Sequence, residues 1–285
     1  MSERGIWAAI FAVAGLDAWL LTASDFSLRW QPELGVAGAV VLLVTLWWIY
    51  RDLRPAPRLA ALAQTGLYYV LYTNALGVLS YLLTGLAGRP LLDGAFAAFD
   101  HTLGFDWLAY HRWFTQAPLR YLGMQVIYLA LGPQLIVLIV LLDPMGYAVR
   151  ARELFVAFLA SSMITVVLGA LLPAAGAFVH YGTPEAHTKL YVQQYLALRD
   201  GSLRVIDLSR GQGLVWFPSF HATLAVLCAW AVRGIRWLFW PMAILDVLIV
   251  AVTPAGGGHY LADVLAGLAL GTLTIAGVHG RMPRS

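Results

Sequence analysis

Apolar residues in this chain occur in long, nearly continuous runs, and polar residues concentrate in the segments between them. A window of about 19 residues, the length that crosses a bilayer as a helix, separates eight such runs. We therefore predict eight transmembrane helices, at residues 5–23, 33–50, 58–84, 119–142, 153–173, 218–232, 236–254 and 258–278. Asp17 interrupts the first run and no convincing small-residue cleavage site follows it, so we predict a retained helix and not a signal peptide.

Arginine is concentrated in four short segments of the chain. These are 51–58, 149–152, 233–236 and the C-terminal RMPRS. Short loops rich in arginine stay in the cytoplasm, so we expect both termini to be cytoplasmic. The longer connecting segments, 85–118 and 174–217, then lie on the outer face, periplasmic or luminal, and we expect a multi-pass protein of the inner (plasma) membrane.

Parts of these outer segments alternate apolar and aromatic residues with charges at near-helical spacing. The two clearest stretches are AAFDHTLGFDWLAYHRWF within 85–118 and PEAHTKLYVQQYLALRD at 184–200. This pattern is typical of helices that lie along a membrane surface. We therefore predict interfacial helices on the outer face.

The composition agrees with a membrane fold. Hydrophobic residues make up 60% of the 285 positions and charged residues 12%, whereas soluble domains carry about 25% charged residues. So few charges could not cover a soluble fold, which leaves an all-α integral membrane protein. The single cysteine, Cys228, forms no intrachain disulfide and makes no zinc site alone. The formal charge of +3 says little about partners.

Two polar clusters stand at the starts of predicted helices on the outer side. In FPSFHA (217–222), Pro218 suits the first helical position, and the Ser219 hydroxyl is placed to bind an anion. In GGGHYLAD (256–263), His259 and Asp263 are four residues apart and share a helix face. A carboxylate that bonds one imidazole nitrogen leaves the other available as a nucleophile or base.

Each cluster could also have an ordinary structural role when it is taken alone. His221 could be an interfacial histidine, and His259 with Asp263 could be a helical hydrogen bond or two ligands of a metal, although no Cys or Glu cluster completes a metal site. Together they predict a site for phosphate, because free N–H groups at helix starts attract anions and glycines such as Gly258 allow close approach.

These residues resemble a known family. FPSFHA, followed 38 positions later by the histidine of GGHYLAD, resembles motifs two and three of the phosphatidic acid phosphatase type 2 superfamily. HYLADVLAG and LLPAAGAF (171–178) are similar to segments of the branch that contains inositol phosphorylceramide synthase (an inositolphosphotransferase) and of the sphingomyelin synthases. The resemblance implies a six-helix catalytic membrane domain at 58–285, with two additional helices at 1–57.

The resemblance also implies a phosphohistidine mechanism. His259 would attack phosphorus, Asp263 would orient and stabilise its imidazole, and His221 would protonate the leaving oxygen and then deprotonate the acceptor. No metal or other cofactor is implied. The expected partners are membrane lipids, either a phospholipid or a lipid phosphate; no nucleic acid is expected, and no protein partner can be inferred.

The chain departs from the phosphatase pattern where phosphate is usually held. The lysine and Arg-Pro of motif one are absent, and Thr253 stands where motif three has arginine. We expect basic residues of the outer loop to replace them, with Arg199 as first choice, although a solvated loop charge is the ordinary role of each. The candidates are Lys189, Arg199, Arg204 and Arg210.

Three functions are compatible with this pattern. The first is a lipid phosphotransferase, which the missing arginine favours because the transferase branch shares its loss. The second is a phosphatase acting on phosphatidate or a polyprenyl pyrophosphate, and the third is a non-enzymatic transporter. No pair of broken helices in matching halves supports the third. Asp17 and Asp246 fall outside the motifs, and Tyr128 and Gln134 could line the cavity.

Overall fold

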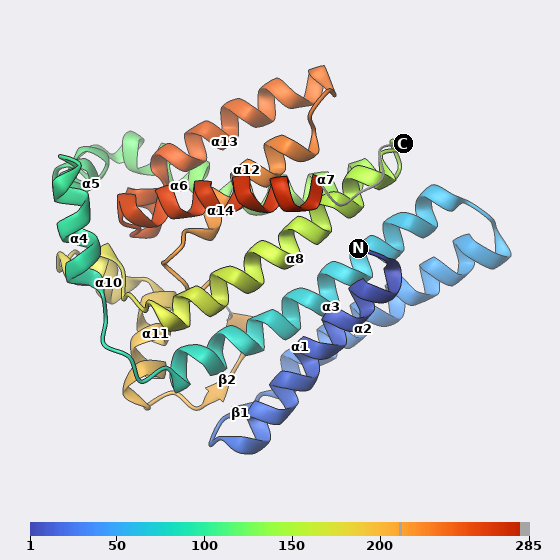
Figure 1. Ribbon diagram of the computed structural model, residues 1–285, viewed down its shortest axis with the longest axis horizontal. Helices are drawn as coiled ribbons and strands as arrows, with labels where there is room; N and C mark the ends of the chain where they lie inside the picture. The colour runs from blue at the N-terminus through green and yellow to red at the C-terminus, as the bar shows by residue number, and fades with distance from the viewer. Residues whose placement is uncertain (211–212, 280–285) are drawn as a thin grey trace.

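A computed structural model describes residues 1–210 and 213–279, and it is almost entirely helical (Figure 1). Seven helical segments among these residues are long and apolar enough to cross a membrane, which confirms the predicted all-α membrane fold. They are α1 (Glu3–Ala23), α2 (Trp30–Trp48) continued by a π-helical turn (Ile49–Leu53), α3 (Pro57–Leu86), α6 (Pro118–Leu129) continued by α7 (Leu131–Leu142), α8 (Ala148–Leu171), α13 (Arg236–Gly257) and α14 (Leu261–His279).

The eighth predicted span is shorter than expected. Helix α12 (Phe220–Ala231) has 12 residues, which extend about 18 Å at 1.5 Å per residue, against about 30 Å for a hydrocarbon core. Ser219 caps the helix, so Pro218 precedes it and the prediction that Pro218 occupies the first helical position is wrong. A turn in which Gly234 has a φ of +78° follows the helix and leads into α13.

Helix α12 packs closely against α14, and small residues make this possible. A Cβ on Gly267 would lie 2.3 Å from the carbonyl oxygen of Ser219, and one on Gly271 would lie 3.0 Å from that of Thr223. The Thr223 hydroxyl in turn donates to the carbonyl of Gly267 at 2.9 Å. Glycines at such contacts let helix backbones approach in a membrane. The starts of α12 and α14 are thereby held side by side.

The short helices gather at one end of the long ones, at the left of Figure 1, away from the N-terminus and from the end of α14. The two connecting segments with interfacial patterns, 85–118 and 174–217, both contain short helices, as predicted. These helices are α4 (Asp93–Thr102), α5 (Trp107–Thr115), α9 (Ala177–His180), α10 (Glu185–Thr188) and α11 (Leu190–Asp200).

The first two helices are joined to the rest of the protein at this same end. Strand β1 (Ser27–Leu28), in the turn between α1 and α2, pairs in parallel with β2 (Val205–Ile206), which is followed by a 3-10 turn (Leu208–Arg210). Both α1 and α2 also pack along α3. The segment before α12 is thus fixed on one side by the N-terminal helices.

Candidate active site

The start of α12 is tied to the start of α14 by Ser219. This residue is fully buried, and its Oγ accepts a hydrogen bond from the N–H of Ala222 at 3.5 Å. Its own N–H donates to the carbonyl of Asp263 at 2.9 Å. A serine at this position satisfies one of the otherwise unpaired donors of a helix start. The hydroxyl that we expected to bind an anion is therefore engaged as a helix cap.

His259 lies in the turn between α13 and α14, and the residue before it shapes that turn. Gly258 has a φ of +70°, a conformation that favours glycine. A Cβ at this position would lie 2.4 Å from Cδ2 of Phe178, and the Gly258 carbonyl accepts from the N–H of Ala177 at 2.8 Å. The segment LLPAAGAF thus packs on the turn, and Phe178 makes the close approach that we had expected of a ligand.

Asp263 stands behind the imidazole of His259. Its Oδ2 lies 3.4 Å from Nδ1 of the ring and accepts a hydrogen bond from the N–H of Tyr260 at 2.8 Å. Asp263 is completely buried and His259 is 4% exposed. Burial lowers the pKa of His259, and a hydrogen bond to the backbone of Trp216 opposes this shift. The imidazole is therefore neutral at pH 7, as a nucleophile must be.

His221 faces the same centre from α12. The centroids of its ring and of the His259 ring are 6.5 Å apart. Tyr128 stacks on His221 at 4.1 Å, with its hydroxyl 3.3 Å from Nδ1. A Cβ on Gly257 would lie 2.4 Å from that hydroxyl, so the glycine run is needed to admit Tyr128. The structure therefore brings the two predicted histidines together and adds Tyr128 as a direct neighbour.

Lys189 reaches toward this centre from the segment between α10 and α11. Its Nζ donates to Oε1 of Gln125 at 3.4 Å. Gln125 and Tyr128 are three residues apart on α6 and lie on the same side of that helix. The lysine therefore points to the side of α6 on which Tyr128 contacts His221.

The predicted arginines lie elsewhere. Arg199 donates to the backbone carbonyl of Ala87, just after α3. The Nε of Arg204 pairs with Oδ2 of Asp25 at 2.9 Å, in the turn between α1 and α2. The side chain of Arg210 lies outside the described residues. The structure thus shows Arg199 and Arg204 bonded to loop backbone and to the N-terminal turn, and no described bond joins either to the histidines.

Asp100, which the sequence analysis did not single out, caps α14 from α4. Its two carboxylate oxygens accept hydrogen bonds from the N–H groups of Leu261 and Ala262, at 2.8 and 2.9 Å. Burial raises the pKa of Asp100, while these two N–H donors oppose that shift. The expectation that the start of α14 presents free N–H groups to phosphate is therefore wrong, because a carboxylate of the protein occupies them.

Asp93 has a similar role at the other end of α4. Its oxygens accept from the N–H groups of Ala175 and Gly176, at 2.9 and 2.8 Å, and from the Tyr260 hydroxyl at 3.0 Å. The segment LLPAAGAF and the His259 turn are thereby bonded to one carboxylate. The sequence signal for Asp93 and Asp100 was their spacing of seven residues, which places both on one face of a helix that is otherwise mostly apolar.

Trp107 supports the His259 turn from α5. Its indole Nε1 donates to the carbonyl of His259 at 2.9 Å and to that of Pro254 at 3.2 Å, and the side chain is fully buried. Thr253, which stands in the place of the usual arginine, is also buried and donates to the carbonyl of Ile249 at 2.7 Å. Thr253 therefore does not replace the missing cation.

The remaining polar candidates lie within the spans. Gln134 on α7 donates to Oδ1 of Asp246 on α13 at 2.9 Å, so the carboxyl group of Asp246 has a partner on a neighbouring helix. Asp17 on α1 is buried, and its Oδ1 has no hydrogen-bond partner in the described part of the chain. Neither carboxyl group forms a described bond to the histidine centre.

Comparison with known families agrees with this geometry. The model of the PAP2 superfamily matches residues 94–277, a range that contains both histidines and Asp263. The chain therefore belongs to the PAP2 superfamily, whose members are phosphatases and phosphotransferases. No curated protein and no solved structure is detectably similar to it. Membership supports an enzyme with a lipid phosphatase or phosphotransferase type of activity, and thus the first two of the three functions considered.

Proposed function

We propose that this protein is a membrane lipid phosphotransferase, which moves a phosphoryl group or a phospho-headgroup from one lipid to another through a phosphohistidine. One observation carries the proposal: His221 and His259 share one centre, with the carboxylate of Asp263 behind His259. This is the arrangement that a nucleophile, its orienting group and a separate acid require.

In the first step, His259 attacks the phosphorus of the donor lipid. Asp263 lies against Nδ1, so we assign the attack to Nε2, and substrate binding has to displace the bond between the ring and the backbone of Trp216. The new N–P bond forms as the P–O bond to the leaving group breaks. His221, which the bound anionic donor favours in its protonated form, gives its proton to the leaving oxygen, and Asp263 stabilises the charge on the His259 ring.

In the second step, an acceptor alcohol loses its proton to His221 while its oxygen attacks the phosphorus. The O–P bond forms, the N–P bond breaks, and both histidines return to their starting states. Tyr128 holds the His221 ring by stacking and through Nδ1, which leaves Nε2 to carry the proton. Water as the acceptor would give hydrolysis by the same residues, which is the phosphatase alternative.

Lys189 is the residue that we assign to the phosphoryl oxygens. It is the basic side chain whose described contact lies on the histidine side of α6, whereas Arg199 and Arg204 are bonded elsewhere. A cation placed before the reaction stabilises charge on the transferring group. Thr253 stands where motif three usually has arginine, and the transferase branch shares the loss of that arginine. This supports phosphoryl transfer over hydrolysis and a place in the inositol phosphorylceramide synthase-like branch.

The arginine-rich segments support an arrangement with both termini in the cytoplasm. The short helices and the histidine centre then lie on the outer face of the inner (plasma) membrane, where the protein would act on lipids of the outer leaflet.

The test is a product analysis with a headgroup-labelled phospholipid and an unlabelled lipid alcohol, in detergent with purified protein. We expect a new labelled lipid; free phosphate or free phospho-headgroup without any new lipid would contradict transfer. His259→Ala should abolish turnover, and Asp263→Asn should lower it by at least about 10². His279→Ala, an exposed histidine at the far end of α14, is the matched control and should leave turnover unchanged.

A further inference from the structure

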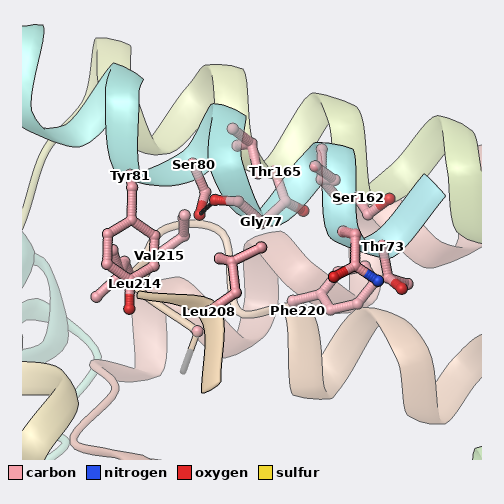
Figure 2. A pocket seen from close by; sticks show the side chains of 14 residues that line it. Thr73, Gly77, Ser80, Tyr81, Ser162, Thr165, Leu208, Leu214, Val215 and Phe220 are labelled. Carbon is pink, nitrogen blue, oxygen red and sulfur yellow. Dashed lines mark hydrogen bonds between the residues drawn. The ribbon is translucent and has the colours of Figure 1, made fainter. Parts of the chain in front are cut away.

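A cavity lies between the packed helices α3 and α8 on one side and the segment before α12 on the other, and it is distinct from the histidine centre. Its volume is about 330 Å³, and Figure 2 shows that α3 and α8 form one wall while Leu214, Val215 and Phe220 form another. Phe220 packs on Phe158 of α8, whereas the next residue, His221, stacks on Tyr128 of α6. The cavity and the catalytic centre are therefore on different sides of α12.

The lining of the cavity is mostly apolar, with a minority of polar groups. Its polar lining consists of hydroxyl and amide groups, and none of the described side chains that line it is charged. Some of these groups are satisfied within their own helices: Ser80 donates to the carbonyl of Gly77 at 2.9 Å, and Ser162 to that of Phe158 at 2.6 Å. Such a surface can hydrogen-bond a neutral polar group, and its described part has no cation to balance a phosphate.

Thr165 is the exception among the lining hydroxyls. The residue is 3% exposed, and its Oγ1 has no hydrogen-bond partner among the residues that the structure describes. Buried polar groups in native proteins are nearly always paired, and an unpaired one is costly. An unpaired hydroxyl in the wall of a cavity points to a ligand that supplies the missing bond.

The depth of the cavity fits the polar end of a lipid. Thr165 is six residues before the end of α8 at Leu171, about 9 Å along the helix axis. The lining residues of α3, from Thr73 to Tyr81, lie in the half of that helix nearer to the short helices. This is the upper hydrocarbon region of one leaflet, where the ester and hydroxyl groups of a glycerolipid meet its chains.

We propose that this cavity binds a neutral, hydroxyl-bearing membrane lipid of the diacylglycerol type. Its hydroxyl or ester group bonds Thr165, and its chains extend along the wall formed by α3 and α8 into the bilayer. An anionic phospholipid is disfavoured as the ligand because its charge would be desolvated without a partner among the described lining residues. The lipid also contacts Leu214 and Val215, which directly precede Trp216, the residue whose backbone bonds His259.

The test is photocrosslinking of the purified full-length protein. The probe is a diacylglycerol with a diazirine near the glycerol end of one acyl chain, and the modified peptides are located by mass spectrometry. We expect label in the segments 73–81, 162–166 or 213–220. Unlabelled diacylglycerol should compete at least about tenfold better than phosphatidylglycerol with the same chains, because only the latter must desolvate a charge.

Two variants and one matched control test the site itself. Thr165→Phe fills the cavity and should reduce labelling of these segments at least about tenfold. Thr165→Val keeps the shape but removes the hydroxyl, and should weaken competition by diacylglycerol about fivefold. The control is Ile164→Phe, which adds the same bulk at the adjacent, 41% exposed residue and should leave labelling unchanged.

The outcomes separate this proposal from the catalytic one. Labelling should persist in His259→Ala, because the cavity does not use that residue. Equal labelling of Thr165→Phe and Ile164→Phe, equal competition by phosphatidylglycerol, or label confined to exposed helix faces would each overturn the proposal. Thermal unfolding in the same detergent shows whether each variant is folded; if Thr165→Phe is not, the competition result for Thr165→Val decides.

Discussion

Asp100 gives the most specific prediction about how the protein positions His259. Its carboxylate accepts hydrogen bonds from the N–H groups of Leu261 and Ala262, at 2.8 and 2.9 Å. These two residues directly follow the turn that contains His259. Replacing Asp100 by alanine leaves both donors without their partner in a buried setting. Replacing it by asparagine keeps one acceptor oxygen and puts an NH₂ group where the other donor needs an acceptor.

The expected cost follows from these two bonds. A hydrogen bond to a charged group contributes about 1.5–3 kcal/mol, so the loss of two in Asp100→Ala should lower the free energy of unfolding by about 3–6 kcal/mol. Asp100→Asn should cost about half as much. A shift of even 1 Å in the position of His259 is expected to cost about 10² in rate, so both variants should lose turnover while substrate binding changes little.

The assay is thermal unfolding in detergent together with kcat and KM for lipid turnover. Asp200→Asn is the matched control, because this exposed carboxylate caps only its own loop through the N–H of Ser202. We expect the control to have normal kcat and stability. A folded Asp100→Ala protein with normal kcat would refute the idea that this carboxylate positions His259, whatever its effect on stability.

Three further substitutions test the surroundings of the histidines. Gly258→Ala should destabilise the protein by about 2–5 kcal/mol, measured by thermal unfolding. The alanine would have to adopt a left-handed φ of +70°, and its Cβ would lie 2.4 Å from Phe178. Tyr128→Phe removes the hydroxyl beside Nδ1 of His221 but keeps the stacked ring, and should lower kcat about tenfold. Lys189→Met should raise KM for the phosphorylated lipid about tenfold or more. Lys189→Arg keeps the positive charge and should raise KM less.

Each of these has an outcome that would contradict it. Normal stability of Gly258→Ala would mean that Phe178 does not constrain the turn. An unchanged pH profile and kcat for Tyr128→Phe would remove its role in holding His221. An unchanged KM for Lys189→Met, together with a raised KM for Arg199→Met, would show that Arg199 and not Lys189 binds the phosphate.

The spans could be predicted because an apolar run of about 19 residues or more rarely forms anything except a membrane-crossing helix. The ends of the helices could not, since capping contacts decide them. The apolar run that includes α12 extends over 218–232, but the Ser219 cap and the turn at Gly234 limit the helix to Phe220–Ala231.

The candidate active site could be predicted only where its residues are close in sequence or belong to a motif. His259 and Asp263 are four residues apart, although His259 lies in the turn before α14 and not on the helix as predicted, and their relation to His221 came from a family pattern. Asp100 bonds residues 161 and 162 positions away. A contact over such a separation cannot be predicted from the spacing of residues in the sequence. Likewise, the long side chain of Arg199 extends to the backbone after α3, a destination that its position in the loop did not indicate.

The most direct test of the central claim is the detection of phosphate on His259. Purified protein is incubated briefly with a phospholipid donor labelled at phosphorus, without acceptor, and the acid-labile label is mapped by peptide mass spectrometry at neutral or alkaline pH. We expect label on His259, its loss in His259→Ala, and its retention in His279→Ala. Turnover without any label on His259, or normal turnover of His259→Ala, would contradict it.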